Sequence, residues 1–440
     1  MKKRAGLGKT VKVAVILVIV ILVSMGLEIQ ANAKSVTKTP IQHVVIIIQE
    51  NHSFFNYWGD YPGVIGGVAD ATCQQYKNGT TLCPYETNVP ESDETLDHGG
   101  RAADIAYNNG SMNQFLIGNP VNQVMSYYNA TVLGYYWGLA EHYTLNDMFF
   151  SSYRSYSLPN HWAAIAGVSP NIAITTMANG VVNNATLSDL LEQASMITTM
   201  LEAVENQKPI TAKYYDEPVK YANLSQAIAL EGKIIPGGYW NPNLEKADAY
   251  TTLRNDFEER TSIFTDISKG KLPAISWVIP NQNISEHPQD DVQLGEQWVQ
   301  SVVDAVMNSK YWSSTAIFIM TDDWGGYYDP IVPSTLPNIS PGNNTAGEQG
   351  LGFRVSALLV SPYANSGIVN TVFSFESVLH FIDYNWGLPL LNQRVADSNN
   401  MLTDFNFNQS PLPAWTGTPL TPAQMQNVMG NASLDTPDVD

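Results

Sequence analysis

The chain has 440 residues and a formal net charge of −19, which results from 22 Lys and Arg residues against 41 Asp and Glu residues. Only 14% of the residues are charged, so the acidity reflects a shortage of Lys and Arg rather than acidic runs. A surface that follows nucleic-acid phosphates needs clustered Lys and Arg, and this composition therefore argues against nucleic acid as a partner.

The first 33 residues have the layout of a secretory signal peptide. A basic start, MKKRAGLGKTVK, precedes an apolar run from Val13 to Leu27, and Ala31-Asn32-Ala33 follows. The run of about 15 residues is shorter than the roughly 20 that a membrane-spanning helix needs, so cleavage is favoured over a retained N-terminal anchor. We expect a secreted or cell-surface protein that contacts a membrane only through this segment or through a lipid substrate. Sequons such as those at Asn78 and Asn109 fit a glycosylated protein.

The two cysteines, Cys73 and Cys83, flank a turn-rich stretch, QQYKNGTTL. In an oxidising exterior, such a pair is expected to form a short-loop disulfide. Two free thiols or a metal-binding pair are the alternative, which is disfavoured because no further Cys or His lies nearby at zinc-site spacing.

Short apolar runs rich in β-branched residues alternate with segments of helical periodicity. Strands are predicted at His43–Gln49, Ala274–Ile279, Thr315–Met320 and Ser356–Val360, and helices at Leu187–Val204, Val292–Met307 and Glu376–Asp383. Near-continuous apolar strands indicate burial on both faces, so we expect an α/β fold with a mostly parallel central sheet between two helical layers, a three-layer α/β/α sandwich. Residues 34–440 are expected to form one large domain with loop insertions.

Polar residues follow two of the predicted strands directly. Glu50 and Asn51 come after HVVIIIQ, and Asp322 and Asp323 come one residue after TAIFIM. Parallel α/β sheets bind ligands at the carboxyl ends of their strands. Three carboxylates gathered there repel one another unless a cation such as Ca²⁺, Mg²⁺ or Mn²⁺ neutralises them. The alternative is that the Asp pair only shapes the following turn, which the matching position of Glu50-Asn51 makes less favourable.

Several sequence blocks occur in a fixed order between about Thr39 and Leu391. They are IQHVVIIIQENHSFFNYWGDYPG, Asp97-His98 with the later GSMNQF, LAEHYTLNDMFFSSYRSYSLPNH, Glu286-His287-Pro288, TDDWGGYYD, GFRVSALLVSPYANSGIV and FESVLHFID. In this order, they resemble the phosphoesterase family of bacterial-type phospholipases C and related acid phosphatases, within the alkaline phosphatase superfamily. The resemblance implies an alkaline-phosphatase-like fold and a hydrolase acting on phosphoric ester bonds.

The resemblance also implies a metal site and a nucleophile. Glu50 and Asn51 match the family's first pair of metal ligands, and Asp322 and Asp323 match the second, for one divalent ion (Ca²⁺, Mg²⁺, Mn²⁺ or Zn²⁺). Ser157, in Ser-Leu-Pro-Asn, stands at the family's Thr or Ser nucleophile. A serine hydroxyl is a weak nucleophile, and coordination to the ion would generate the alkoxide. Its attack on phosphorus would give a phosphoserine intermediate that water later hydrolyses.

Further residues are expected to contact the phosphate. Asn160, three residues after the serine, matches a family Asn and is expected to bind substrate. His98 and His287 match family histidines that hydrogen-bond the non-bridging oxygens or protonate the leaving alkoxide. His161 stands where the family usually has Arg, so a phosphate contact and plain packing are both open for it. A proline, Pro330, replaces the His that commonly follows the family Asp at 329.

An acid phosphatase is the favoured activity within this family. Ser157 and the Asp-Asp pair are closer to the acid phosphatase branch, and the chain lacks the long C-terminal extension of the lipid enzymes. A phospholipase C or other phosphodiesterase is the alternative. A non-catalytic surface protein that retains the fold is a further alternative, which the departures at His161 and Pro330 slightly favour. A carboxylic esterase is disfavoured because no Gly-x-Ser-x-Gly elbow surrounds the serine.

Overall fold

The computed structural model describes residues 37–170, 196–205, 209–216, 257–335 and 350–430, together with the single residues 193 and 207. Thr37–Asp440 forms one compact unit. The predicted signal segment lies outside the described residues, as do residues 187–192, 194 and 195 of the helix predicted at Leu187–Val204. The rest of that prediction is helical at 193 and 196 and again in α9 (Met200–Glu205), but residues 197–199 are not helical, so the single helix predicted there is interrupted. Cleavage of the leader and a domain boundary at residue 34 therefore stay predictions.

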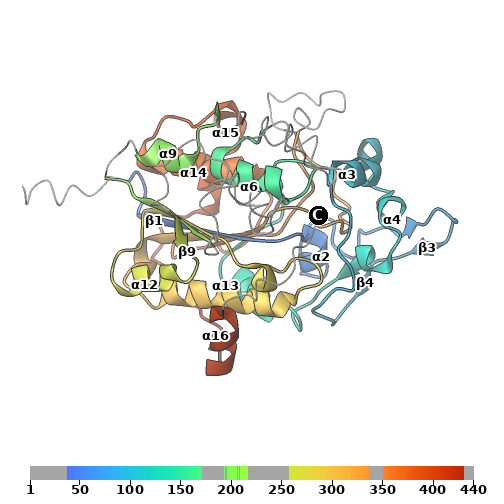
Figure 1. Cartoon of the computed structure of the whole chain (residues 1–440), viewed down its shortest axis with the longest axis horizontal. Helices are drawn as coiled ribbons and strands as arrows, with labels where there is room; N and C mark the ends of the chain where they lie inside the picture. Colours follow the sequence, from blue (N-terminus) through green and yellow to red (C-terminus); the bar gives the residue numbers. More distant parts are fainter. Residues whose placement is uncertain are drawn as a thin grey trace, which may run out of the picture. The chain divides into compact units, whose positions relative to one another are not determined.

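An eight-stranded sheet forms the centre of this unit (Figure 1). In spatial order its strands are β13 (Gly367–Val369), β6 (Thr144–Asn146), β12 (Ala357–Val360), β11 (Thr315–Thr321), β1 (His43–Gln49), β10 (Ile275–Val278), β8 (Ala212–Asp216) and β9 (Phe257–Glu259). β1 pairs in parallel with β10 on one side and with β11 on the other. The carboxyl ends of these three strands therefore meet at one edge of the sheet.

The four strands predicted from apolar runs are confirmed as β1, β10, β11 and β12. β1 has the predicted bounds, and the others differ by one residue at one or both ends. β1 and β11 are buried along almost their whole length, which explains their near-continuous apolar sequences. β12 runs antiparallel to both β11 and β6, so the sheet is mostly but not fully parallel, as expected.

Helices cover both faces of the sheet, as the prediction of a three-layer α/β/α sandwich requires. In Figure 1, α12 and α13 lie below the sheet, and α6, α9, α14 and α15 lie above it. The predicted helix Val292–Met307 is α13 with the same bounds, and the helix predicted at Glu376–Asp383 lies within α14. The helices are α2 (Phe54–Trp58), α3 (Gly100–Tyr107), α4 (Phe115–Gly118), α5 (Gly134–His142), α6 (Ser157–Ala166), α9 (Met200–Glu205), α12 (Ser262–Ser268), α13 (Val292–Met307), α14 (Phe375–Trp386), α15 (Gln393–Asp397) and α16 (Pro422–Met429).

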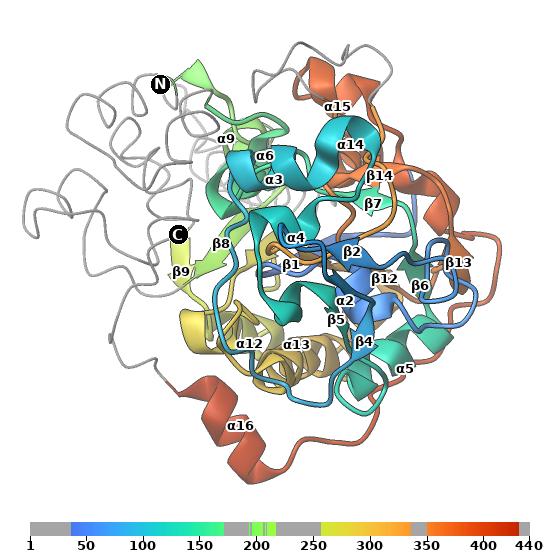
Figure 2. The same cartoon turned by 90° about the vertical axis from the view of Figure 1, so that its right-hand side faces the viewer.

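The segment that follows β1 covers the carboxyl edge of the sheet (Figures 1 and 2). It holds α2, α3, α4 and the short strands β2 (Gln74–Gln75), β3 (Thr81–Leu82), β4 (Tyr85–Glu86) and β5 (Ser126–Tyr127). The predicted disulfide is confirmed, since Cys73 and Cys83 are bonded across the β2–β3 hairpin. Asn78 and Asn109 are exposed, and their glycosylation stays a prediction.

A buried ionic network joins this covering segment to the sheet. The Arg354 guanidinium, which is fully buried, lies 2.8 Å from Asp147 Oδ1 and 3.1 Å from Asp329 Oδ2. Asp329 Oδ2 also accepts a hydrogen bond from the backbone N–H of Phe55 in α2. Asp329 is therefore occupied in holding the start of α2, and Pro330 after it is half-buried.

None of the helices in the described part of the chain combines the length and the apolar character that a bilayer span requires.

Candidate active site

Two loops that leave the sheet edge side by side carry the predicted metal ligands. Gln49 and Thr321, the last residues of β1 and β11, are paired in register, so the polar residues after each strand are brought together. The backbone N–H of Asn51 donates to Asp322 Oδ1 at 2.9 Å. Asn51 itself has a left-handed backbone, with φ of 57°, which Asn tolerates better than most residues do.

Gly325 allows the two loops to touch. Its φ of +56° is unfavourable for residues with a side chain, and a Cβ added there would lie 1.6 Å from the carbonyl oxygen of Asn51. The Asp323 carboxylate closes the same turn, because its Oδ1 accepts the Gly325 N–H at 2.7 Å. The close approach of the two loops therefore depends on a glycine at this position.

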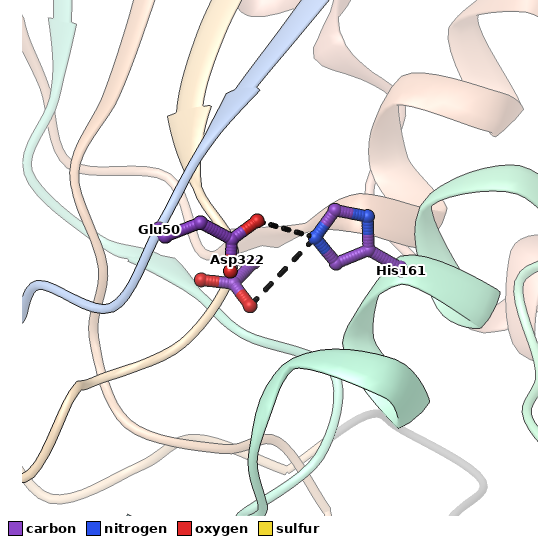
Figure 3. A group of neighbouring side chains, drawn as sticks. All are labelled: Glu50, His161 and Asp322. Carbon is purple, nitrogen blue, oxygen red and sulfur yellow. Dashed lines mark hydrogen bonds and ion pairs between the residues drawn. The ribbon is translucent and has the colours of Figure 1, made fainter. Parts of the chain in front are cut away.

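Glu50, His161 and Asp322 form a buried group that can hold a metal ion (Figure 3). One ligand atom of each lies within 4.8 Å of those of the other two. His161 Nε2 is 2.9 Å from Glu50 Oε1 and 3.8 Å from Asp322 Oδ2. The three side chains come from the end of β1, from α6 and from the end of β11, so the fold rather than local sequence assembles them.

The charges of this group favour a bound cation. Burial, followed by the negative charge of Glu50, raises the pKa of Asp322 to about 7. Burial also lowers the pKa of His161 to about 4, so its imidazole is neutral and cannot compensate the carboxylates. Asp322 Oδ2 has no hydrogen-bond partner among the described residues. Two buried carboxylates and a neutral imidazole are a donor set that fits a divalent metal ion.

The predicted nucleophile lies beside this group. Ser157 Oγ donates to Asn51 Oδ1 at 3.0 Å and is 3.5 Å from Asp323 Oδ2. Ser157 is the first residue of α6, and the residue before it provides no side-chain cap for the helix. The positive end of the helix dipole is thus directed to the serine, where an anionic group would be stabilised.

His98 joins the serine cluster through Asn51. Asn51 Nδ2 donates to His98 Nε2 at 3.3 Å, and this nitrogen is 3.9 Å from Asp323 Oδ2. His98 Nδ1 lies 2.7 Å from the carbonyl oxygen of Leu96, which fixes the ring orientation. The ring of His287 lies 6.3 Å from that of His98 between centroids. The structure therefore brings the predicted nucleophile Ser157 and both predicted catalytic histidines into one cluster.

Asn160 holds the loop before the predicted nucleophile. Its Oδ1 accepts the backbone N–H of Tyr153 at 2.9 Å, and its Nδ2 donates to the carbonyl of Tyr156 at 3.1 Å. These contacts give it a positioning role for Ser157, while the predicted substrate contact stays a prediction. A second anchor of the loop is Ser152, whose hydroxyl donates to Glu376 Oε2 at 2.7 Å.

The structure adds a third possibility for His161, a place in the group that can hold a metal ion, while the phosphate contact stays a prediction. The His161 ring is directed at the two carboxylates Glu50 and Asp322. One signal was available: Ser157 and His161 are four residues apart on one helix, so they lie on the same helical face. The predicted ligands Asn51 and Asp323 lie instead on the Ser157 side, and their metal contacts stay predictions.

The remaining histidines have structural partners. Their Nδ1 atoms hydrogen-bond the carbonyl of Pro273 (His43), the side chain of Asn56 (His52), the carbonyl of Gly138 (His142) and the carbonyl of Ser398 (His380).

A family model and the sequences of known proteins both relate this chain to phosphoesterases. A model of the Phosphoesterase family matches residues 41–389. The non-hemolytic phospholipase C of Burkholderia pseudomallei is 27% identical over 452 residues, covering 90% of this chain and 63% of that protein. Phospholipase C B of Mycobacterium tuberculosis is 27% identical over 431 residues, covering 86% of this chain and 80% of that protein. The chain thus spans less than two thirds of the Burkholderia protein.

Among solved structures, a protein in the alkaline phosphatase superfamily from Vibrio parahaemolyticus is similar at 12% identity and a TM-score of 0.37, covering 84% of this chain and 74% of that one.

Proposed function

Because the chain belongs to the phosphoesterase family, we propose that it hydrolyses phosphoric esters and that Ser157 is its nucleophile. The observation that carries this proposal is the position of Ser157 Oγ, at a helix N-terminus and 3.5 Å from Asp323 Oδ2, beside the group of Glu50, His161 and Asp322. A hydroxyl next to a carboxylate and a positive helix end is suited to attack an anionic phosphorus centre.

The cation is held by Glu50, Asp322 and His161 in this proposal. A nitrogen ligand among carboxylates favours Mn²⁺ or Zn²⁺ over Ca²⁺ or Mg²⁺, which prefer oxygen ligands only. When bound, such an ion would neutralise the carboxylates, polarise the phosphoryl group and make the serine hydroxyl more acidic.

The chain's own residues then account for each bond and proton. Ser157 Oγ forms a bond to phosphorus as the bond to the leaving oxygen breaks, and the hydroxyl proton passes to Asp323 Oδ2. His98 Nε2 is occupied by Asn51, so His287 is the donor that protonates the leaving alkoxide. Water then bonds to phosphorus as the bond to Ser157 Oγ breaks; the proton from water passes to His287, and the proton on Asp323 returns to the serine oxygen. Asn160 holds the loop that presents the serine throughout.

Acid phosphatase activity is the favoured form of this function. His287 Nδ1 lies 3.1 Å from the carbonyl oxygen of Pro288, to which it donates. Proton donation from the other ring nitrogen, Nε2, therefore requires the doubly protonated ring. Ser157 is also only 1% exposed, and such an enclosed serine is reached more easily by a terminal phosphate than by a phosphate with two substituents. Cleavage of a phosphodiester is the second candidate, because both relatives described above are phospholipases C.

The test compares p-nitrophenyl phosphate, bis(p-nitrophenyl) phosphate and phosphatidylcholine between pH 4 and 8, with purified protein before and after chelation. The Ser157→Ala variant is expected to lose turnover. Ser155→Ala is the matched control, because the Ser155 hydroxyl is buried in the same loop without a hydrogen-bond partner among the described residues. Equal loss in both variants would contradict the assignment of the nucleophile. A folded wild-type protein that turns over none of the substrates with any added divalent ion would favour the non-catalytic alternative.

Metal content provides an independent measurement. His161→Ala is expected to lose the bound ion, measured by plasma mass spectrometry. His380→Ala is expected to retain it, because the His380 ring hydrogen-bonds the backbone carbonyl of Ser398 and not a carboxylate of the proposed metal site. Unchanged metal content in His161→Ala would remove this histidine from the ligand set.

A further inference from the structure

Glu286 precedes the proposed proton donor His287 and is fully buried. Its carboxylate accepts three hydrogen bonds from side chains, from Tyr57 OH at 2.5 Å, Tyr136 OH at 2.5 Å and Gln49 Nε2 at 2.8 Å. These donors lie on α2, α5 and β1, so the carboxylate joins three separate elements behind the cluster of the nucleophile. A carboxylate with three donors and no exposed surface has no access to substrate.

The backbone at Glu286 is also unusual. Its φ of 72° lies in the left-handed region, which non-glycine residues adopt only when their surroundings hold them there. The carbonyl oxygen of Glu286 accepts a hydrogen bond from His52 Nε2 at 2.7 Å. The side chain and the carbonyl group of Glu286 are thus both anchored. Together they hold the backbone conformation that sets the direction of the next side chain, His287.

Gly295 provides the space for this side chain. It lies within α13, where glycine is a poor helix former. A Cβ added to Gly295 would lie 2.2 Å from Cγ and 2.8 Å from Oε1 of Glu286. The helix therefore carries a glycine at the point where the Glu286 side chain packs against it.

The segment is tied to the rest of the site on its other side. The carbonyl oxygen of Ser285 accepts the backbone N–H of Glu50 at 2.7 Å, and the Ser285 hydroxyl accepts the N–H of His287 at 3.1 Å. Residues 285–287 thus link the position of His287 to the end of β1, which is followed by the proposed metal ligand Glu50.

We propose that Glu286 is a positioning residue, whose carboxylate, held by Tyr57, Tyr136 and Gln49, sets the orientation of the His287 imidazole for protonation of the leaving group. The inference rests on the proposed function, in which His287 donates this proton. Glu286 acts through His287 and does not contact the substrate itself.

The experiment compares two monoester substrates that differ in their need for protonation. p-Nitrophenolate leaves without a proton, whereas the alkoxide of glycerol 2-phosphate requires one. Glu286→Ala is expected to lower kcat for glycerol 2-phosphate at least 10-fold, with a much smaller change for p-nitrophenyl phosphate and little change in KM. Glu286→Gln, which keeps the volume and one acceptor oxygen, should recover part of this loss.

Gly295→Ala displaces the carboxylate without removing it. We expect the same substrate-dependent loss, although alanine is the better helix former. Gln297→Ala on the same helix is the matched control and should keep wild-type values, because Gln297 is half-buried and takes part in none of the contacts of Glu286 described above. In a double-mutant cycle, Glu286→Ala should add no further loss to His287→Ala, since the first residue acts through the second.

Equal losses of kcat for both substrates, or additive losses in the double-mutant cycle, would overturn the proposal. Glu286 would then contribute only to the stability of the fold. If the wild-type protein lacks turnover, the proposed function fails, yet the positioning can still be measured. In protein labelled with ¹⁵N-histidine, the His287 ring signals, assigned by their loss in His287→Asn, should shift or broaden in Glu286→Gln and Gly295→Ala and stay in place in Gln297→Ala. Unchanged ring signals in folded variants would refute the positioning role.

Discussion

Replacement of Arg354 by Met provides the strongest test of how the covering segment is held on the sheet. The guanidinium is fully buried, with Nη1 2.8 Å from Asp147 Oδ1 and 2.7 Å from the carbonyl of Ile65, and Nε 3.1 Å from Asp329 Oδ2. Methionine fills much of the volume but leaves two buried carboxylates without their cation. Removal of one partner of a buried ion pair destabilises a protein by about 3–5 kcal/mol, and here two pairs share the partner.

We therefore expect the unfolding free energy of Arg354→Met at pH 7 to fall by about 3–5 kcal/mol, measured by urea unfolding with tryptophan fluorescence. Burial already raises the pKa of Asp147 and of Asp329, and loss of the guanidinium raises both further. The folded variant then binds protons that the unfolded chain has released, so the loss should shrink as the pH falls towards 4.

A matched control is Lys213→Met, which breaks pairs with Glu258 at 3.1 Å and with Asp266 at 2.7 Å, in both of which the Lys213 side chain is 26% exposed. This change should cost about 1 kcal/mol or less per pair, because solvent reaches the ammonium group and screens both pairs. A loss of similar size in the two variants, or a loss for Arg354→Met that does not vary with pH, would refute the reasoning.

Three further outcomes are expected. Gly325→Ala should lower kcat/KM for p-nitrophenyl phosphate by about 100-fold, because the new Cβ displaces Asn51 and misplacement of about 1 Å has effects of this size; wild-type kinetics would contradict the close contact. Double replacement of Cys73 and Cys83 by Ser should reduce the unfolding free energy by about 2–3 kcal/mol in urea titrations, and an unchanged midpoint would rule this out. Burial raises the pKa of Asp404 to about 7, so the folded chain holds a proton there that the unfolded chain has lost. Stability should therefore fall as the pH rises from 4 to 7, by up to about 1.4 kcal/mol per unit from this group, and Asp404→Asn should lack that part of the slope; an identical slope would show that Asp404 does not contribute.

The long elements of the fold could be predicted because each carries its own signal. The apolar run of β1 and the valines on one face of α13 are local patterns, and both elements have the predicted bounds. The strands β6 (TLN), β8 (AKYYD) and β13 (GIV) carry no comparable signal, because polar residues interrupt the first two and the third has only three residues. The equally short strands β10 and β12 could be predicted because they lie within longer apolar runs. The antiparallel direction of β12 is set by the path of the chain before it, which no local pattern records.

In the candidate site, too, some residues could be predicted from local sequence and others depend on the folded chain. Glu50 and Asp322 could be predicted because polar residues that follow buried strands stand out, and Ser157 because of the resemblance of its block to a known family. The place of His161 depends on how α6 crosses the sheet edge, which only the folded chain defines. The role of Glu286 likewise depends on two tyrosines far away in sequence.

The central place of β1 has a consequence for synthesis of the protein. Its two neighbours, β10 and β11, end at Val278 and Thr321, so the pairing of an early segment waits for residues made much later. At roughly 5–20 residues per second, the ribosome needs roughly 15–55 s to extend the chain from the end of β1 to the end of β11. Until β10 has been made, the strand HVVIIIQ has neither of these partners, and its exposed apolar side chains are available to chaperones. Co-translational folding of this protein is therefore expected to start late, after most of the chain has emerged.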